Sequence, residues 1–62
     1  MSNSKEQILE VLEKYGELNI SKLARITGIH YRVLVKRLKE LVEEGLVEER
    51  RFGRLRLFRI KK

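Results

Sequence analysis

The feature that most constrains the fold of this 62-residue chain is the spacing of apolar residues between positions 20 and 46. These residues recur mostly at steps of three and four, which places them on the buried side of helices. They are Leu23, Ile26, Ile29, Leu34, Leu38 and Leu41. Ser21 stands where a first helix would be capped, and Gly28 stands where the chain must turn sharply. The pattern predicts a helix at 21–27, a tight turn, and a second helix at 30–44.

Two longer motifs surround this turn. The run Leu-Ala-x-x-Thr-Gly-Ile begins at Leu23, the run Leu-Lys-x-Leu-x-x-x-Gly-Leu-Val begins at Leu38, and the apolar Leu34 lies between them. Together they resemble the winged helix-turn-helix domain of bacterial and archaeal transcription regulators. A helix-turn-helix pattern alone matches many unrelated chains, but here a basic hairpin follows at the distance that the family shows. The resemblance covers about residues 5–60 and implies an α+β fold of three helices with a C-terminal two-stranded β-hairpin, the wing.

The remaining segments supply the other elements of such a fold. Ser4 opens a first helix with the pattern of a capping box, and Gly16 follows the end of that helix. Apolar and polar residues alternate at 17–20, which indicates a short third strand. The segments 46–51 and 55–60 read as the two strands of a hairpin, 46–60, whose turn contains a glycine. The residues of the second strand expected to face the core are Phe58 and Ile60, and those expected on the opposite face are Leu55 and Leu57.

Charge is distributed in blocks along the chain. Residues 21–39 hold six bases and no acid, residues 40–49 hold five glutamates and no base, and residues 50–62 hold seven bases and no acid. The formal net charge is +6. Because the two basic blocks coincide with the second helix of the motif and with the hairpin, they favour a polyanion-binding surface over a merely solvated one.

We expect double-stranded DNA to contact both basic blocks. On the helix at 30–44, the bases that share the face opposite the buried stripe would enter the major groove. They are Arg32, Lys36 and Lys39. The free backbone amides at the start of the helix 21–27, with Ser21 and Lys22 beside them, would hold a phosphate. The resemblance implies that arginines of the wing reach the DNA backbone or the minor groove. These are Arg50, Arg51, Arg54 and Arg56.

Three residues near the start of the helix 30–44 fit this assignment less simply. His30 stands where the family usually has a serine or threonine cap, and we expect it to cap the helix or contact a phosphate. Tyr31 and Val35 lie about 50° and about 90° from the centre of the buried stripe. Either both widen that stripe, or Val35 touches a thymine methyl and Tyr31 a phosphate.

Composition excludes several other classes. The chain has no Cys, no Asp and one His, so it offers no convincing catalytic set and no metal site. We therefore expect no enzyme, no cofactor and no small-molecule ligand. Its apolar runs are too short to cross a membrane, which predicts a cytoplasmic, nucleoid-associated protein. A charged fraction of 39% with glutamate as the only acid is typical of proteins from hot environments.

The leading prediction is a single domain, 1–62, that binds duplex DNA as a small transcription regulator. The alternatives are an architectural chromatin protein with little sequence preference and a winged helix used for protein–protein contact. Z-DNA-binding winged helices carry Asn and Tyr where this chain has Val35 and Lys39, and a proline pair in the wing that is absent here. A Z-DNA function is therefore not expected.

A homodimer is also expected, because a domain of this size is near the lower limit for a self-sufficient core. The alternative is a monomer in which Leu55 and Leu57 pack under the first helix or the N-terminal tail. The resemblance implies that two recognition helices would lie in successive major grooves. Two surfaces are open as the interface. One is the face of the first helix around Leu9 and Tyr15, and the other is the sheet face bearing Leu55 and Leu57.

Overall fold

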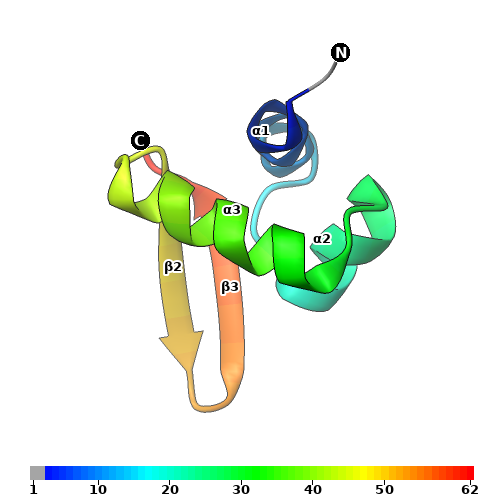
Figure 1. The fold of residues 1–62 in the computed structure, drawn as a ribbon. Helices are drawn as coiled ribbons and strands as arrows, with labels where there is room; N and C mark the ends of the chain where they lie inside the picture. The colour runs from blue at the N-terminus through cyan, green and yellow to red at the C-terminus, as the bar shows by residue number, and fades with distance from the viewer. Residues whose placement is uncertain (1–2) are drawn as a thin grey trace.

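The computed structural model describes residues 3–62 and shows three helices and a small sheet (Figure 1). In chain order the elements are α1 (Ser4–Tyr15), β1 (Leu18–Asn19), α2 (Ile20–Thr27), α3 (Tyr31–Glu43), β2 (Val47–Phe52) and β3 (Leu55–Ile60). In Figure 1, α3 crosses in front of the hairpin, while the far end of the hairpin extends below all three helices. The predicted winged helix-turn-helix fold is confirmed.

The sheet is antiparallel, with the strand order β1-β3-β2. The register of the hairpin runs from the pair Val47–Ile60 at its base to the pair Phe52–Leu55 at its tip. β1 pairs Leu18 with Phe58, so the third strand predicted at 17–20 exists. It is shorter than predicted, because the chain already enters α2 at Ile20.

One core joins all three helices to the sheet. Its buried members are Ile8, Leu12, Leu18, Ile20, Leu23, Leu34, Leu38, Leu41, Val47 and Phe58. As predicted, Phe58 faces this core, with Ile60 packed against it, and Leu55 points outward. The prediction that Ile26 is buried was wrong, since its side chain is 39% exposed. Ile20 belongs to α2 and sets its buried face, and Ile26, six positions later, lies away from that face.

Asparagines, not the predicted serines, cap the first two helices. The backbone N–H of Lys22 donates to Asn19 Oδ1 over 2.8 Å, so Ser21 lies inside the first turn of α2. In the same way Asn3, not Ser4, is the N-cap of α1. Asn19 has the extended backbone that a cap residue requires, and its amide oxygen reaches the unpaired N–H of the first turn as well as a serine hydroxyl would.

α3 begins and ends one residue inside the predicted range 30–44. His30 is its cap as expected, with the imidazole Nδ1 accepting the N–H of Arg32 over 3.3 Å. At the other end Gly45 has φ 78, and the amides of Gly45 and Leu46 donate back to carbonyls of the last turn. This left-handed residue closes α3 and directs the chain into β2.

Ion pairs join the start of α1 to the second half of α3. Lys5 Nζ lies 2.7 Å from a carboxylate oxygen of Glu44 and 3.6 Å from one of Glu40, which also accepts a 2.9 Å hydrogen bond from Arg37. The hydrogen bond from Arg37 lowers the pKa of Glu40 below its ordinary value of 4.5. The five-glutamate block is thus partly neutralised within the protein.

Acid is expected to destabilise the fold partly through Glu40. A carboxyl whose pKa is lower in the folded state stabilises that state above the unfolded pKa, and this contribution disappears as the pH falls through the folded value. The free energy of unfolding, measured by denaturant titration, should therefore decline between about pH 5 and about pH 3. Glu40→Gln should make the decline shallower. Glu43→Gln is the matched control, because Glu43 is exposed on the same helix, and an equal change in both variants would contradict the assignment.

Candidate nucleic-acid interface

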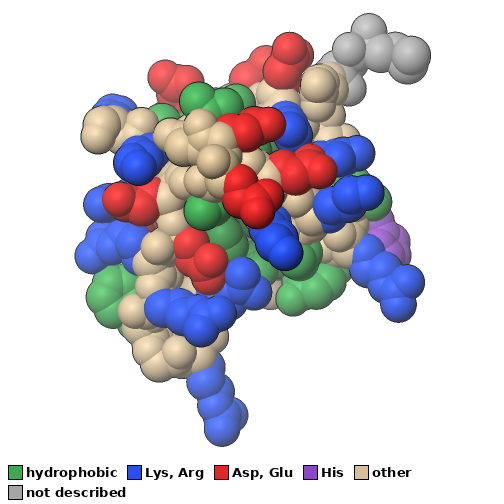
Figure 2. Space-filling model, turned by 60° about the vertical axis from the view of Figure 1, so that its left-hand side comes forward, with side chains coloured by type: hydrophobic (Ala, Val, Ile, Leu, Met, Phe, Trp, Pro, Cys, Tyr) green, Lys and Arg blue, Asp and Glu red, His purple; other side chains and the backbone are tan. Residues whose placement is uncertain are grey.

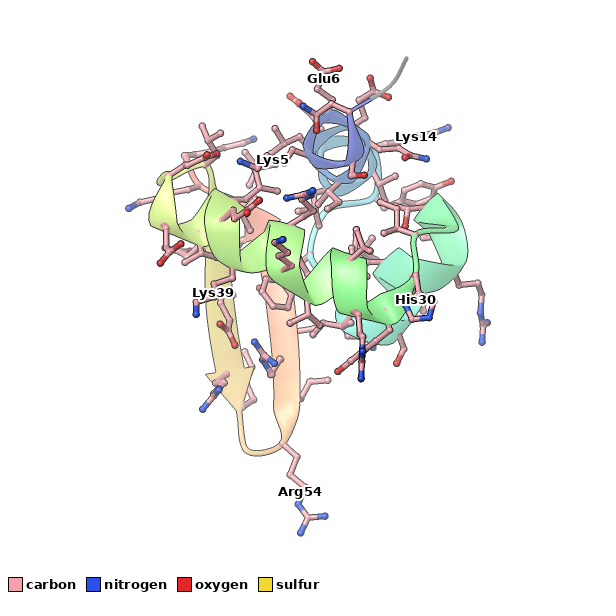
Figure 3. The ribbon with its side chains drawn as sticks, in the orientation of Figure 1. Lys5, Glu6, Lys14, His30, Lys39 and Arg54 are labelled. Carbon is pink, nitrogen blue, oxygen red and sulfur yellow. The ribbon has the colours of Figure 1, made fainter. Side chains whose placement is uncertain are left out.

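Three basic side chains are exposed together on α3. Arg32, Lys36 and Lys39 lie on the side of the helix that does not pack on the core. Figure 3 shows Lys39 extending from α3 on the hairpin side. Among residues 3–62, none of the three bases forms an ion pair with a glutamate. Their full charges face solvent along one helix, as the sequence predicted.

The starts of α2 and α3 meet the wing in a polar hollow of about 230 Å³. Asn19 and Ser21 line it from the α2 side, Tyr31 from the first turn of α3, and Arg54 and Arg56 from the hairpin. Lys22 and His30 are exposed at the starts of α2 and α3. The fold thus brings together Ser21, Tyr31 and two wing arginines from three separate segments, whereas Lys22 and His30 do not line the hollow.

The structure separates the two residues whose orientation the sequence left open. Tyr31 is 56% exposed, so of the two alternatives left open for it, the one in which it widens the buried stripe does not hold. Val35 is half-buried and packs against the core, where it lines a shallow groove with Phe58 and Lys39. For Val35, a place at the edge of the buried stripe fits this geometry better than an exposed contact with a thymine methyl.

Two of the wing arginines are bound by one carboxylate. Glu49 on β2 accepts a hydrogen bond from Arg56 Nε over 2.7 Å, and Arg51 Nε lies 3.6 Å from the same oxygen. The hydrogen bond from Arg56 holds the pKa of Glu49 below its ordinary value. In the free protein both arginines therefore have an acidic partner, close for Arg56 and more distant for Arg51, whose side chain is 70% exposed.

The other two wing arginines differ from one another. Arg50 is held by Glu17, whose carboxylate lies 3.3 Å from its guanidinium. Arg54 forms no ion pair within residues 3–62 and extends from the tip of the hairpin (Figure 3). Gly53 precedes it with φ 61, the pattern of a type II′ turn, so the strands are joined by two residues only. The wing offers one free arginine at a narrow tip.

Charges of opposite sign gather on different parts of the molecule. The outer face of α1 carries exposed Glu6, Glu10 and Glu13. In the space-filling view most acidic side chains lie in the upper half, and basic side chains dominate the lower edge (Figure 2). A polyanion would therefore be attracted to α3 and the hairpin tip and repelled by α1.

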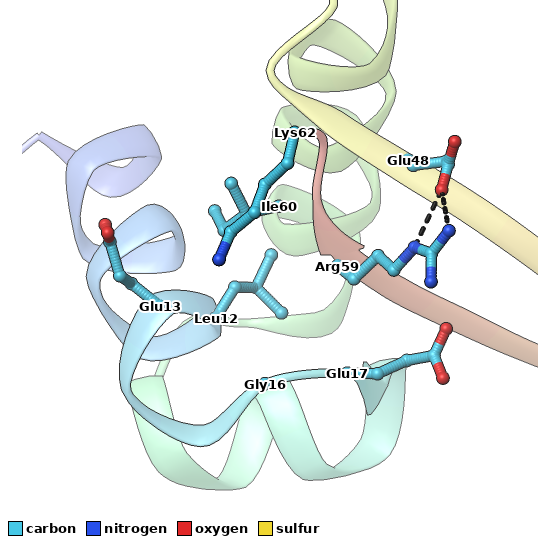
Figure 4. A pocket seen from close by; sticks show the side chains of 8 residues that line it. All are labelled: Leu12, Glu13, Gly16, Glu17, Glu48, Arg59, Ile60 and Lys62. Atoms are coloured by element: carbon cyan, nitrogen blue, oxygen red, sulfur yellow. Dashed lines mark hydrogen bonds and ion pairs between the residues drawn. The ribbon is translucent and has the colours of Figure 1, made fainter.

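A larger hollow, of about 530 Å³, lies at the base of the sheet (Figure 4). It is lined by Leu12, Glu13, Gly16, Glu17, Glu48, Arg59, Ile60 and Lys62. Arg59 is bound to Glu48 at its edge, so acids and bases are mixed around it. This hollow is at the opposite end of the hairpin from Arg54 and does not belong to the basic surface.

Within residues 3–62, no three side chains of the types that ligate metals come together. The helices in this part of the chain are also too short or too polar to cross a bilayer.

Residues 1–48 match the family model described as winged helix-turn-helix DNA-binding. This span covers the three helices and the start of the hairpin. A comparison with curated proteins finds no match.

Solved structures match the whole fold. The homodimeric winged helix-turn-helix DNA-binding domain of a possible ArsR-family transcriptional regulator from Mycobacterium bovis is 33% identical, with a TM-score of 0.83. The match covers 97% of this chain and 56% of that one. A predicted DNA-binding transcriptional regulator from E. coli is 30% identical, with a TM-score of 0.85, over 100% of this chain and 66% of that one.

More distant structures share the fold alone. The PcaV transcriptional regulator from Streptomyces coelicolor is 18% identical, with a TM-score of 0.91, over 100% of this chain and 46% of that one. The chain thus spans between about half and two thirds of the length of these solved proteins.

Proposed function

Because this chain belongs to the winged helix-turn-helix DNA-binding family, we propose that it binds double-stranded DNA as a transcription regulator, with α3 in the major groove. The observation that carries the proposal is the row of three unpaired bases on α3, beside a hairpin that ends in the free Arg54. Residues 1–62 would act as one domain, in the cytoplasm and on the nucleoid. The regulators from M. bovis and E. coli support this assignment.

The proposed contacts divide by their chemistry. Arg32 and Lys36 would read base edges, since side chains at the N-terminal part of a recognition helix reach deepest into the groove. Residues around the polar hollow would hold phosphates and fix the orientation of the domain. In this group we place Ser21, Lys22, His30 and Tyr31.

The function is tested by titrating the protein against a labelled random duplex and against a single strand of the same length. We expect tighter binding to the duplex at low salt, because α3 and the wing are arranged to follow two grooves of a helix. Failure to bind duplex at low salt would reject DNA binding and favour a winged helix that contacts proteins.

We propose further that the chain works as a homodimer, as its relative from M. bovis does. The proposed interface is the exposed face of α1 around Tyr15, whose side chain is 53% exposed. The sheet face bearing Leu55 is less suitable, because the free Arg54 and the bound Arg50 lie beside it, and two copies would bring like charges together.

Sedimentation equilibrium at micromolar concentration should give the mass of a dimer. Tyr15→Lys should shift the distribution toward monomer, since it places two cations in the proposed interface. The matched control is Leu55→Lys, which changes an equally exposed apolar residue on the sheet and should leave the mass unchanged. A single monomeric species for the unmodified chain would rule out the dimer.

A further inference from the structure

The tip of the wing carries an apolar surface next to its free arginine. Phe52 ends β2 and lies opposite Leu55, the first residue of β3, across the hairpin. The two side chains are 51% and 45% exposed. Since side chains alternate along a strand, they share the outer face of the sheet with Arg50 and Leu57. The tip of the hairpin extends below the helices in Figure 1, and of these residues Leu55 also lines the polar hollow between the wing and the starts of α2 and α3.

The ring of Phe52 is held in place although it is exposed. The guanidinium carbon of Arg50 lies 5.0 Å from the ring centroid, and Glu17, which directly precedes the other edge strand β1, anchors Arg50 over 3.3 Å. One face of the ring is therefore occupied by a fixed cation. The remaining surface of the ring is open to solvent and already oriented, which lowers the entropy that a contact would cost.

The inner face of the hairpin repeats this arrangement with a different outcome. There Glu49 holds Arg56, whose guanidinium carbon lies 5.6 Å from the ring centroid of Phe58. Phe58 is 2% exposed, so its ring is completed by the core of the protein itself. On the outer face the corresponding glutamate, arginine and phenylalanine are Glu17, Arg50 and Phe52. Here no core covers the ring, and Phe52 stays 51% exposed.

The charges around Phe52 decide which partner suits it. Arg51 and Arg54 are its near neighbours in the chain, and the acids close to the tip are already bound to arginines. A second copy would bring these arginines against one another, whereas a polyanion would be attracted. The two-residue turn also makes the tip narrow enough for a minor groove, where proteins place arginines and apolar side chains together.

The resemblance to winged helix regulators already implies a wing arginine, here Arg54, at the DNA backbone or in the minor groove. We propose that Phe52 and Leu55 add an apolar contact there, packed against the sugars of the groove wall. This inference rests on the proposed duplex binding and adds to it an uncharged contact. Phe52 would then contribute affinity that salt does not screen, because burial of apolar surface involves no release of counterions.

The test compares the salt dependence of binding in matched variants on one A·T-rich duplex. Phe52→Ala is expected to weaken binding about fivefold at every salt concentration, with the log–log slope unchanged. Phe52→Leu should retain most of the affinity. Arg54→Ala, the charged control at the same tip, should instead make the slope shallower by about 0.9.

Three results would overturn the inference. Binding by Phe52→Ala equal to that of the unmodified protein would show that the ring does not touch DNA. A shallower slope in Phe52→Ala would mean that the ring only positions arginines, and a lower sedimentation mass would mean that it contacts a second copy. Thermal melting of both Phe52 variants checks that the fold is intact. If the unmodified chain bound no duplex, the proposed function itself would fail, which this comparison separates from a failure of the wing contact alone.

Discussion

Raising the salt concentration from about 50 mM to about 200 mM is expected to weaken binding to random duplex DNA by about 500-fold. Each phosphate neutralised by the protein contributes about 0.9 to the slope of log affinity against log salt, and roughly five neutralised phosphates give a slope near −4.5. The free bases on the proposed surface are Lys22, Arg32, Lys36, Lys39 and Arg54. Titrations by fluorescence anisotropy in a series of KCl concentrations measure this slope.

The slope also shows whether the wing arginines leave their glutamates when DNA binds. Arg50, Arg51 and Arg56 are bound to glutamates in the free protein and are not counted above. If DNA drew all three away from their glutamates, the slope would approach about −7. A slope near zero would contradict electrostatic binding altogether.

The second large effect on DNA affinity is expected from the basic side chains of α3. Replacing Arg32 or Lys36 by Ala should cost roughly 1–3 kcal/mol on a preferred sequence and much less on random duplex, because a base contact discriminates between sequences. Arg54→Ala should weaken all sequences about equally, since a contact to the backbone or minor groove carries little sequence information. The measurement is competition between a duplex selected by rounds of binding and enrichment and its random counterpart.

The opposite pattern would reverse the assignment. If Arg54→Ala changed sequence preference while Arg32→Ala and Lys36→Ala did not, the wing would read the DNA and α3 would only position the domain. If selection yielded no preferred sequence, an architectural role would replace regulation.

The order and type of the helices and strands were predictable because each depends on a pattern within its own short stretch of sequence. The three- and four-residue spacing of Leu34, Leu38 and Leu41 defines α3, and Gly45 and Gly53 mark two of the four points where φ is positive. The caps of α1 and α2 were misassigned by one and two residues, whereas His30 was correctly expected to cap α3. Both Asn19 and Ser21 can cap a helix, and which of them does depends on where the backbone leaves β1, which is a tertiary property.

Local sequence patterns could not show which wing arginines form ion pairs with glutamates and which stay free. Glu49 binds Arg56 diagonally across the hairpin, so the pair appears only once the strand register is known. Assuming a two-residue turn around Gly53 would have fixed that register and placed the two side chains on one face. The bond from Arg50 to Glu17 spans 33 positions and depends on β1 joining the sheet, for which the sequence carries only a short alternation.

The glutamates that hold the wing arginines have a consequence for how such a protein can diverge. In the proposed complex, general affinity for DNA would depend on how many of these arginines are free, and Glu17 and Glu49 set that number from positions outside α3. A substitution at Glu17 would free one arginine and a substitution at Glu49 would free two, whereas a substitution at Arg32 or Lys36 would change which sequence is preferred. Descendants of one ancestral gene could therefore alter occupancy of the genome and choice of operator by separate, single mutations.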